Sequence, residues 1–308
     1  MKKRYTLEEH LQTNILYDTT LLDTWRINKK RFESKLQATV QSFPSYSLHD
    51  ISHSNNVIDN IECLLGESGI NQLSLTDTWL ILHAALLHDW GMVLTSSQIQ
   101  DVIGTRDFNE YIEKKRFSND KDISNAIKDI ENIKTEQLAI SNAYSIRNSI
   151  TLILSEYFRK YHGDNSYKRI LENIFGNYNL CYDLIQSRLL EMLADIVLCH
   201  TRDINFVLEL PQQQKGQNKD LFHPRFIAIL LRLGDLLDVE NNRFNDAIFQ
   251  TFFEKLPEKS LLHLKKHYSL KELLITDDEI AIKLDCPDTS TYRVARQTID
   301  WIKNDLNF

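Results

Sequence analysis

Residues 79–90, WLILHAALLHDW, and residues 224–238, PRFIAILLRLGDLLD, decide the fold of this chain. Both runs are apolar on nearly every side of a helix, which is typical of helices at the centre of a bundle. Pro224 stands at the start of the second run, where a proline suits the first helical turn. We therefore predict two central helices around which the rest of the chain packs.

Helical patterns continue outward from these two runs. Apolar residues recur every three or four positions over 21–43 and 53–65, and we predict further helices at about 146–161, 166–175 and 182–200. Residues 95–145 are charged and rich in amides, with thin apolar stripes, so we expect an outer helical layer or lid there.

The end of the chain has a different pattern. Two short β-rich runs flank Asp277 and Asp278 and predict a hairpin, and residues 291–306 predict a final helix. The predicted fold class is therefore mainly α. We expect a helical bundle domain over residues 1–245 and a small hairpin-plus-helix extension over residues 246–308 packed on it.

The composition excludes several other classes of protein. Eight glycines and five prolines among 308 residues are too few for the turns of a β-sandwich or for the glycine loops of a nucleotide-binding α/β fold. No glycines form G-x-G-x-x-G, and none precedes a lysine as a P-loop requires. Dinucleotide-binding and P-loop functions are excluded.

Charge and cysteine usage limit the partners and the compartment. A net charge of −7 repels a long polyanion, although a local basic pocket could still hold one phosphate or a short strand. The four cysteines form no C-x-x-C pair and lie in apolar stretches, which indicates free thiols in a reducing compartment. With no apolar signal segment and no long apolar run, we expect a cytoplasmic protein that does not bind membranes.

Ionisable residues interrupt the apolar helices at a few positions. His88 and Asp89 end the first central run, Asp235 lies inside the second, His200 ends ADIVLCH, and His53 opens a helix. A buried carboxylate costs several kcal/mol unless it is paired or binds a metal. Imidazole and carboxylate ligands from separate helices are how bundles build metal sites. This donor set suits Mn, Mg, Fe, Co, Ni or Zn, and the absence of thiolates argues against a structural zinc.

The order of these residues resembles the HD superfamily of metal-dependent phosphohydrolases. The flanking stretches SLHDISHSNNVI (47–58), LLHDWGM (86–92) and RFIAILLRLGDLLDVENNRF (225–244) are similar to the HD-CE branch. In that branch the HD module is often joined to a GHKL-type ATPase. The resemblance extends from about residue 45 to the C-terminus and implies an HD-domain helical bundle.

The resemblance implies that His53, His88, Asp89 and Asp235 bind one divalent metal, and that His200 binds a second metal or faces the substrate. Asp89 and His200 would be catalytic in hydrolysing a nucleotide, a phosphate ester or a short single-stranded nucleic acid with metal-activated water. Guanidinium groups match phosphate oxygens, so the candidate substrate-binding residues include three arginines. The candidates are Arg202, Arg147, Arg232 and, at the entrance, His49.

One element of the branch is hard to place in this sequence. The branch usually has Arg-x-x-His in its middle helix, and the match at Arg147 puts Ile150 where the histidine belongs. With His162 about three helical turns further on, this alignment predicts a missing second-metal ligand. It favours an alternative function, a catalytically silent sensor or docking module that binds metal and nucleotide within a larger ATPase-containing assembly.

Two further expectations concern residues near these motifs. We predict a structural ion pair between Asp238 and Arg243. His83, on the first central run, is expected to be a core residue. The oligomeric state, and whether the chain is a complete protein or an excised domain, stay open.

Overall fold

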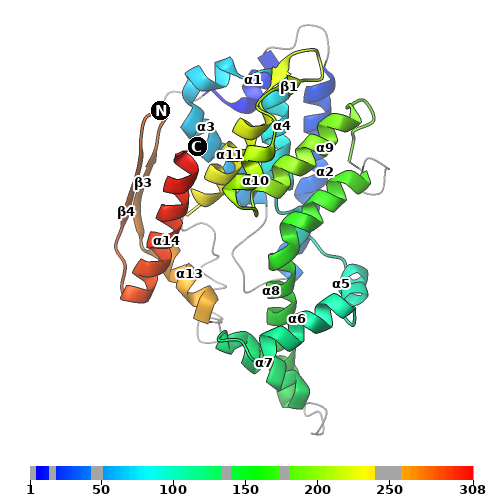
Figure 1. Ribbon diagram of the computed structural model, residues 1–308, viewed down its shortest axis with the longest axis vertical. Helices are drawn as coiled ribbons and strands as arrows, with labels where there is room; N and C mark the ends of the chain where they lie inside the picture. Colours follow the sequence, from blue (N-terminus) through cyan, green and yellow to red (C-terminus); the bar gives the residue numbers. More distant parts are fainter. Residues whose placement is uncertain are drawn as a thin grey trace.

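The computed structural model describes residues 5–13, 19–42, 51–132, 140–173, 180–239 and 258–307. Helices dominate these ranges, and the strands within them form two antiparallel pairs (Figure 1). The predicted mainly α fold class is confirmed. Within the described ranges, no helix is long and apolar enough to cross a membrane.

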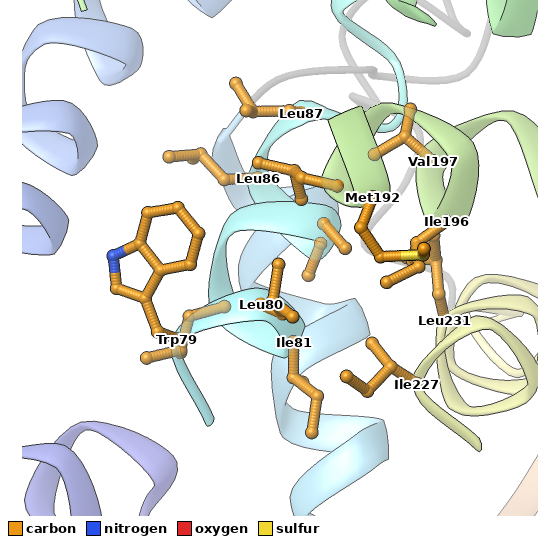
Figure 2. Close-up of a cluster of buried hydrophobic side chains, with 14 of the residues drawn as sticks. Trp79, Leu80, Ile81, Leu86, Leu87, Met192, Ile196, Val197, Ile227 and Leu231 are labelled. Carbon is orange, nitrogen blue, oxygen red and sulfur yellow. The ribbon is translucent and has the colours of Figure 1, made fainter. Parts of the chain in front are cut away.

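The two predicted central helices lie at the core. In helix α4 nearly every side chain is buried, and it packs against α3, α9 and α11. Figure 2 shows Trp79 and Leu86 on the left of α4, and Met192, Ile196 and Ile227 of the neighbouring helices on its right. Helix α4 begins at Leu75, directly after Ser74, which forms a reciprocal capping box with Asp77. These helices are α3 (Ile51–Gln72), α4 (Leu75–Leu87), α9 (Ser187–Cys199) and α11 (Pro224–Leu236).

The remaining sides of α4 are covered by shorter elements. Trp25 and Phe32 from α2 are buried in the same core, and the indole nitrogen of Trp79 donates to Thr24 Oγ1 over 2.9 Å. The sequence did not indicate the short β1–β2 pair, which lies in a polar stretch. These elements are α1 (Leu7–Thr13), α2 (Thr20–Ser42), η1 (Trp90–Met92), α10 (Ile204–Glu209), β1 (Gln214–Lys215) and β2 (Leu221–Phe222).

A single long helix, α8 (Ile140–Asn173), replaces the two helices predicted at 146–161 and 166–175. The predicted break between them was wrong. Gly163 sits inside the continuous helix, where an added Cβ would lie 2.2 Å from Thr201 Oγ1. The glycine therefore allows α8 to approach the end of α9 closely and does not end the helix.

Residues 95–132 fold beside the first half of α8. Helix α7 packs on α8 and α6 packs on α7, and in Figure 1 both lie away from the central helices. Their buried side chains form a second apolar cluster, separate from the main core. We call α5–α7 and the first half of α8 the outlying bundle. Its action as a lid stays a prediction. The helices are α5 (Ser96–Val102), α6 (Arg106–Arg116) and α7 (Lys121–Asn132).

The C-terminal part contains the predicted hairpin and final helix. Strands β3 and β4 pair with Ile275 opposite Ile280, and Ile302 of the last helix packs on Leu233 of α11 and on Leu237, which follows it. The predicted domain boundary after residue 245 lies outside the described residues and stays a prediction. The elements are α13 (Glu258–Tyr268), β3 (Leu270–Ile275), β4 (Ile280–Leu284) and α14 (Thr289–Leu306).

Candidate metal centre

Three helices bring imidazoles and carboxylates together in the interior. His53 from α3 and His88 at the end of α4 face each other, with 3.0 Å between their Nε2 atoms. Asp89 Oδ2 lies 3.3 Å from each of these nitrogens. Asp235 Oδ1 from α11 lies 3.3 Å from His53 Nε2 and 4.0 Å from His88 Nε2. We call these four residues the first ligand group.

A second group lies on the other side of Asp89. Its Oδ1 atom is 3.4 Å from His162 Nε2 of α8 and 4.0 Å from His200 Nε2 at the end of α9. The two imidazoles approach each other with 2.8 Å between their Nε2 atoms. Both Asp89–His53–His88 and Asp89–His162–His200 have ligand atoms close enough together to hold a metal ion. The two groups share Asp89, and each uses one of its oxygens.

The Nδ1 atoms of all four histidines are already engaged. His53 Nδ1 faces Asp238 Oδ2, whereas the others face backbone carbonyls, at Ala85 for His88, Arg159 for His162 and Val197 for His200. Because carbonyl and carboxylate oxygens only accept, each Nδ1 carries the proton. In a neutral ring the Nε2 atom then offers a lone pair.

This tautomer leaves the Nε2 atoms suited to bind a metal. Two lone pairs that face each other at 3.0 Å or 2.8 Å repel unless both nitrogens bind the same cation. Nitrogen and carboxylate oxygen ligands suit Mn, Mg, Fe, Co, Ni or Zn, and no thiol belongs to either group. Histidine metal ligands commonly donate their other N–H to a carbonyl or carboxylate, as all four do here. The residues present therefore fit a divalent metal.

In the chain without a metal, the carboxylates favour a proton on His88, where a bound cation would take its place, whereas His200 and Asp235 already have the charge state of metal ligands. Burial disfavours the charged form of His88, but the adjacent Asp89 and the nearby Asp235 outweigh it and raise the His88 pKa. Burial, with His162 and His88 close by, lowers the pKa of His200 to about 3. Asp235 is also desolvated, yet His53 and His88 hold its pKa below the usual range. His200 is thus neutral and Asp235 ionised at neutral pH, as metal ligands must be.

A set of contacts holds the His88–Asp89 turn against α8. The Gly91 backbone N–H donates to Ser166 Oγ over 2.7 Å, and this hydroxyl donates to the His88 carbonyl over 2.7 Å. Arg169 donates to the carbonyls of Trp90 and Val93. A Cβ at Gly91 would lie 2.0 Å from the His162 carbonyl, so only glycine allows this approach. These contacts fix His162 relative to His88 and Asp89.

The HD-CE family model matches residues 43–307. The chain belongs to the HD-CE family. No curated protein and no solved structure matches it significantly. The match covers the central helices, both ligand groups, the outlying bundle and the C-terminal hairpin and helix.

The HD-CE fold brings together five residues that the sequence predicted as ligands. His53, His88, Asp89 and Asp235 converge as expected, and His200 faces the second group. Their metal-binding and catalytic roles stay predictions. His83 lies in the core, fully buried beside Trp79, as expected.

The predicted phosphate-binding residues do not converge on the centre in the same way. Arg147 is exposed on α8, about 22 Å along the helix from His162. Arg202 pairs with Asp164, and Arg232 forms a two-point ion pair with Asp305 at 2.8 and 2.9 Å. Arg232 therefore joins α11 to α14 in this HD-CE chain. His49 lies outside the described residues.

Two functional residues were missed in the sequence. The expectation that His162 lies too far along its helix was wrong, because Arg159-Lys160-Tyr161-His162 has the Arg-x-x-His spacing and Ile150 is an exposed residue elsewhere on α8. The match to Arg147 hid this signal. Asp238 pairs with His53 and accepts from Asn56 Nδ2 over 3.0 Å, while its predicted partner Arg243 lies outside the described residues.

Proposed function

We propose that this HD-CE chain is a metal-dependent phosphohydrolase that acts on a nucleotide, a phosphate ester or a short single-stranded nucleic acid. The observation that carries the proposal is the sharing of Asp89 between two ligand groups whose four Nε2 atoms all face inward. Two adjacent cation positions suit phosphoryl transfer, in which charge develops on both the attacking and the leaving oxygen.

The roles of the side chains follow from their contacts. His53, His88, Asp89 and Asp235 would hold one ion, and Asp89, His162 and His200 would hold the other. A bound divalent cation supplies Lewis-acid polarisation of a phosphoryl oxygen and acidifies water for attack on phosphorus. Asp89 sets the separation of the two positions because each group uses one of its oxygens.

The position of His200 favours a ligand over a proton donor. Its Nδ1–H is directed to the Val197 carbonyl, so its Nε2 atom, which faces His162, lacks a proton to give. We therefore assign His200 to the second ion, and Asp89 stays the one residue common to both groups. Arg202 is exposed near His200 and would meet a phosphate only after leaving Asp164.

The sensor alternative rested on the loss of a second-metal ligand at Ile150. His162 supplies an imidazole at that place in the centre, so this support is gone. An experiment still separates the two functions. The protein is loaded with Mn, Mg, Co or Ni, its metal content is measured, and it is assayed with nucleotides, cyclic nucleotides, phosphate esters and single-stranded oligonucleotides.

The isosteric Asp89→Asn variant provides the comparison. For a hydrolase we expect turnover to fall at least about a hundredfold, the scale of losing a positioned catalytic group, with the helical circular dichroism spectrum retained. Wild-type turnover no higher than that of Asp89→Asn would overturn the hydrolase. If a nucleotide then raised the wild-type melting temperature only with metal present, the sensor would be supported instead.

We also propose a partner and a cellular compartment. The HD-CE branch resemblance suggests an assembly with a GHKL-type ATPase, which pull-down with and without ATP would test. The four free cysteines suggest a cytoplasmic protein. Its cellular location can be measured by fractionation.

A further inference from the structure

Strand β4 forms an outer edge of the structure. Within the described ranges its sheet contains only β3 and β4, and in Figure 1 β3 lies between β4 and the body. An edge strand presents unpaired N–H and C=O groups that can pair with another strand. A two-stranded hairpin is also only marginally stable unless it gains further strands or packs on a helix.

The backbone direction along β4 can be read from the hairpin end. Thr276 N–H donates to the Glu279 carbonyl over 2.9 Å, so Glu279 points its carbonyl toward β3. The alternation in an antiparallel pair then turns the backbone groups of Ala281 and Lys283 toward β3 as well. The backbone groups of Ile280, Ile282 and Leu284 therefore face the open edge.

We propose that this edge pairs with β4 of a second copy of the chain. The two strands run antiparallel across a two-fold axis at Ala281, and together they make a four-stranded sheet. In this register Ile280 of each copy forms a hydrogen-bonded pair with Ile282 of the other. Such an interface uses the same surface on both copies, as in most homodimers.

Charge complementarity selects this register. A two-fold axis at Ala281 places Glu279 of each copy opposite Lys283 of the other. Lys283 already faces Glu272 of its own β3, so it would lie between two carboxylates. Opposite charges across strands each contribute about 0.2–1 kcal/mol. A two-fold axis at Ile282 would align the whole strand but oppose Glu279 with Asp285.

The apolar surface is also continuous across the proposed interface. Ile280 and Ile282 pack on the cluster that contains Ile302, and the pairing would extend this apolar face into the second copy. A groove of about 560 Å³ runs beside the end of β4, lined by Leu284, Tyr292 and Arg296 among others. In the same register the acidic turn of the second copy, Asp277–Asp278, comes next to Leu284 and therefore to Arg296.

Two charge reversals test the proposal through the oligomeric state. We expect the wild type to be a dimer in analytical ultracentrifugation over a concentration series. The two-fold axis makes two pairs between positions 279 and 283 in each dimer. Lys283→Glu and Glu279→Lys each give both pairs like charges, so each variant should weaken dimerisation at least about tenfold. The variant with both changes should dimerise again. An equimolar mixture of the two single variants should form a heterodimer, since both pairs between positions 279 and 283 then join a glutamate to a lysine.

A cysteine pair tests the register itself. Ala281 of each copy would form a pair without backbone hydrogen bonds, whose Cα atoms lie about 4.5 Å apart, within the range for a disulfide. The Ala281→Cys variant should therefore form a disulfide-linked dimer on oxidation, and the neighbouring Ile282→Cys variant should not. The wild type measures any background from its four native cysteines.

The outcomes that overturn the proposal are distinct. A wild type that stays monomeric at every concentration removes the interface. A dimer that neither charge reversal weakens, or single variants that do not associate when mixed, places the interface elsewhere. Disulfide formation through Ile282→Cys instead of Ala281→Cys moves the two-fold axis. Thermal melts of each variant verify that the hairpin and α14 stay folded.

Discussion

His53 Nδ1 donates a hydrogen bond to Asp238 Oδ2 over 2.5 Å, between two side chains that are almost completely buried. This contact fixes the proton on Nδ1 and turns the His53 Nε2 atom toward His88. The carboxylate also makes the imidazole a stronger ligand. Asp238 would therefore act on a bound metal through His53.

We predict that Asp238→Asn weakens binding of the first ion by about 10- to 100-fold, because the neutral amide supports His53 less well. Competition with a chelator measures the change. Asn56→Ala is the matched control, since it removes only the 3.0 Å hydrogen bond to the other oxygen of Asp238. Equal affinities of Asp238→Asn and wild type would show that His53 needs no partner.

His162→Ala should remove one ion of the pair and leave the other bound. The reason is that His162 contributes only to the group on the Oδ1 side of Asp89. Metal content per chain, measured after dialysis, checks this expectation. Ile150→Ala, on the same helix but about 18 Å away, should keep the wild-type content. An unchanged content in His162→Ala would contradict the second group.

Gly91→Ala should destabilise the protein by about 1–3 kcal/mol or more, because its Cβ would overlap the His162 carbonyl. Separation of the His88–Asp89 turn from α8 should also reduce binding of the second ion. Urea unfolding and metal content measure both effects. Gly69→Ala, which meets only the flexible side chain of Leu65, is the control. A stable Gly91→Ala protein with full metal content would be the opposite result.

Asp305→Asn should destabilise the fold by about 3–5 kcal/mol, the cost of leaving a buried charge without its partner. The Arg232 guanidinium is mostly buried and also donates to the carbonyls of Cys199 and Arg202 on either side of His200. Chemical denaturation gives the loss. Asp300→Asn, from an exposed pair with Arg296 on the same helix, should change stability by less than about 1 kcal/mol.

We expect the buried His83 to make the stability of the protein depend on pH. Burial lowers its pKa from 6.5 to about 3. Between these two pH values the imidazole is protonated in the unfolded chain and neutral in the folded chain. The stability that comes from keeping His83 neutral is complete above pH 6.5 and is lost as the pH falls toward 3. His83→Gln should reduce the pH slope of unfolding free energy by up to about 1.4 kcal/mol per pH unit. Urea titrations at pH 7, 6 and 5 measure that slope, and equal slopes would exclude His83 as its source.

The central helices and the residues of the first ligand group could be predicted because their signal is local. An ionisable residue inside a strongly apolar helix, as at Asp235, is unusual wherever it occurs. His162 lies in a helix with a weaker apolar stripe, so its direction toward the core could not be read from periodicity. An Arg-x-x-His spacing at Arg159 was present, but Arg147, twelve positions earlier, offered a competing alignment.

Other features depend on contacts between distant segments. The continuity of α8 through Gly163 follows from its fit against Thr201, which a local pattern cannot show. Asp238 was assigned to an ion pair because its neighbour in sequence is an arginine, whereas its partner in space is 185 residues away. Helix α13 lies in a stretch where no pattern was recognised.

The long helix α8 gives the two ligand groups different mechanical supports. The first group is carried by α3, α4 and α11, all within the central core, whereas His162 is carried by the helix that also anchors the outlying bundle. Along this continuous helix, about 33 Å separate the N-terminal end from His162. A displacement of α6 or α7 would therefore change the distance between His162 and His200 more than the distance between His53 and His88.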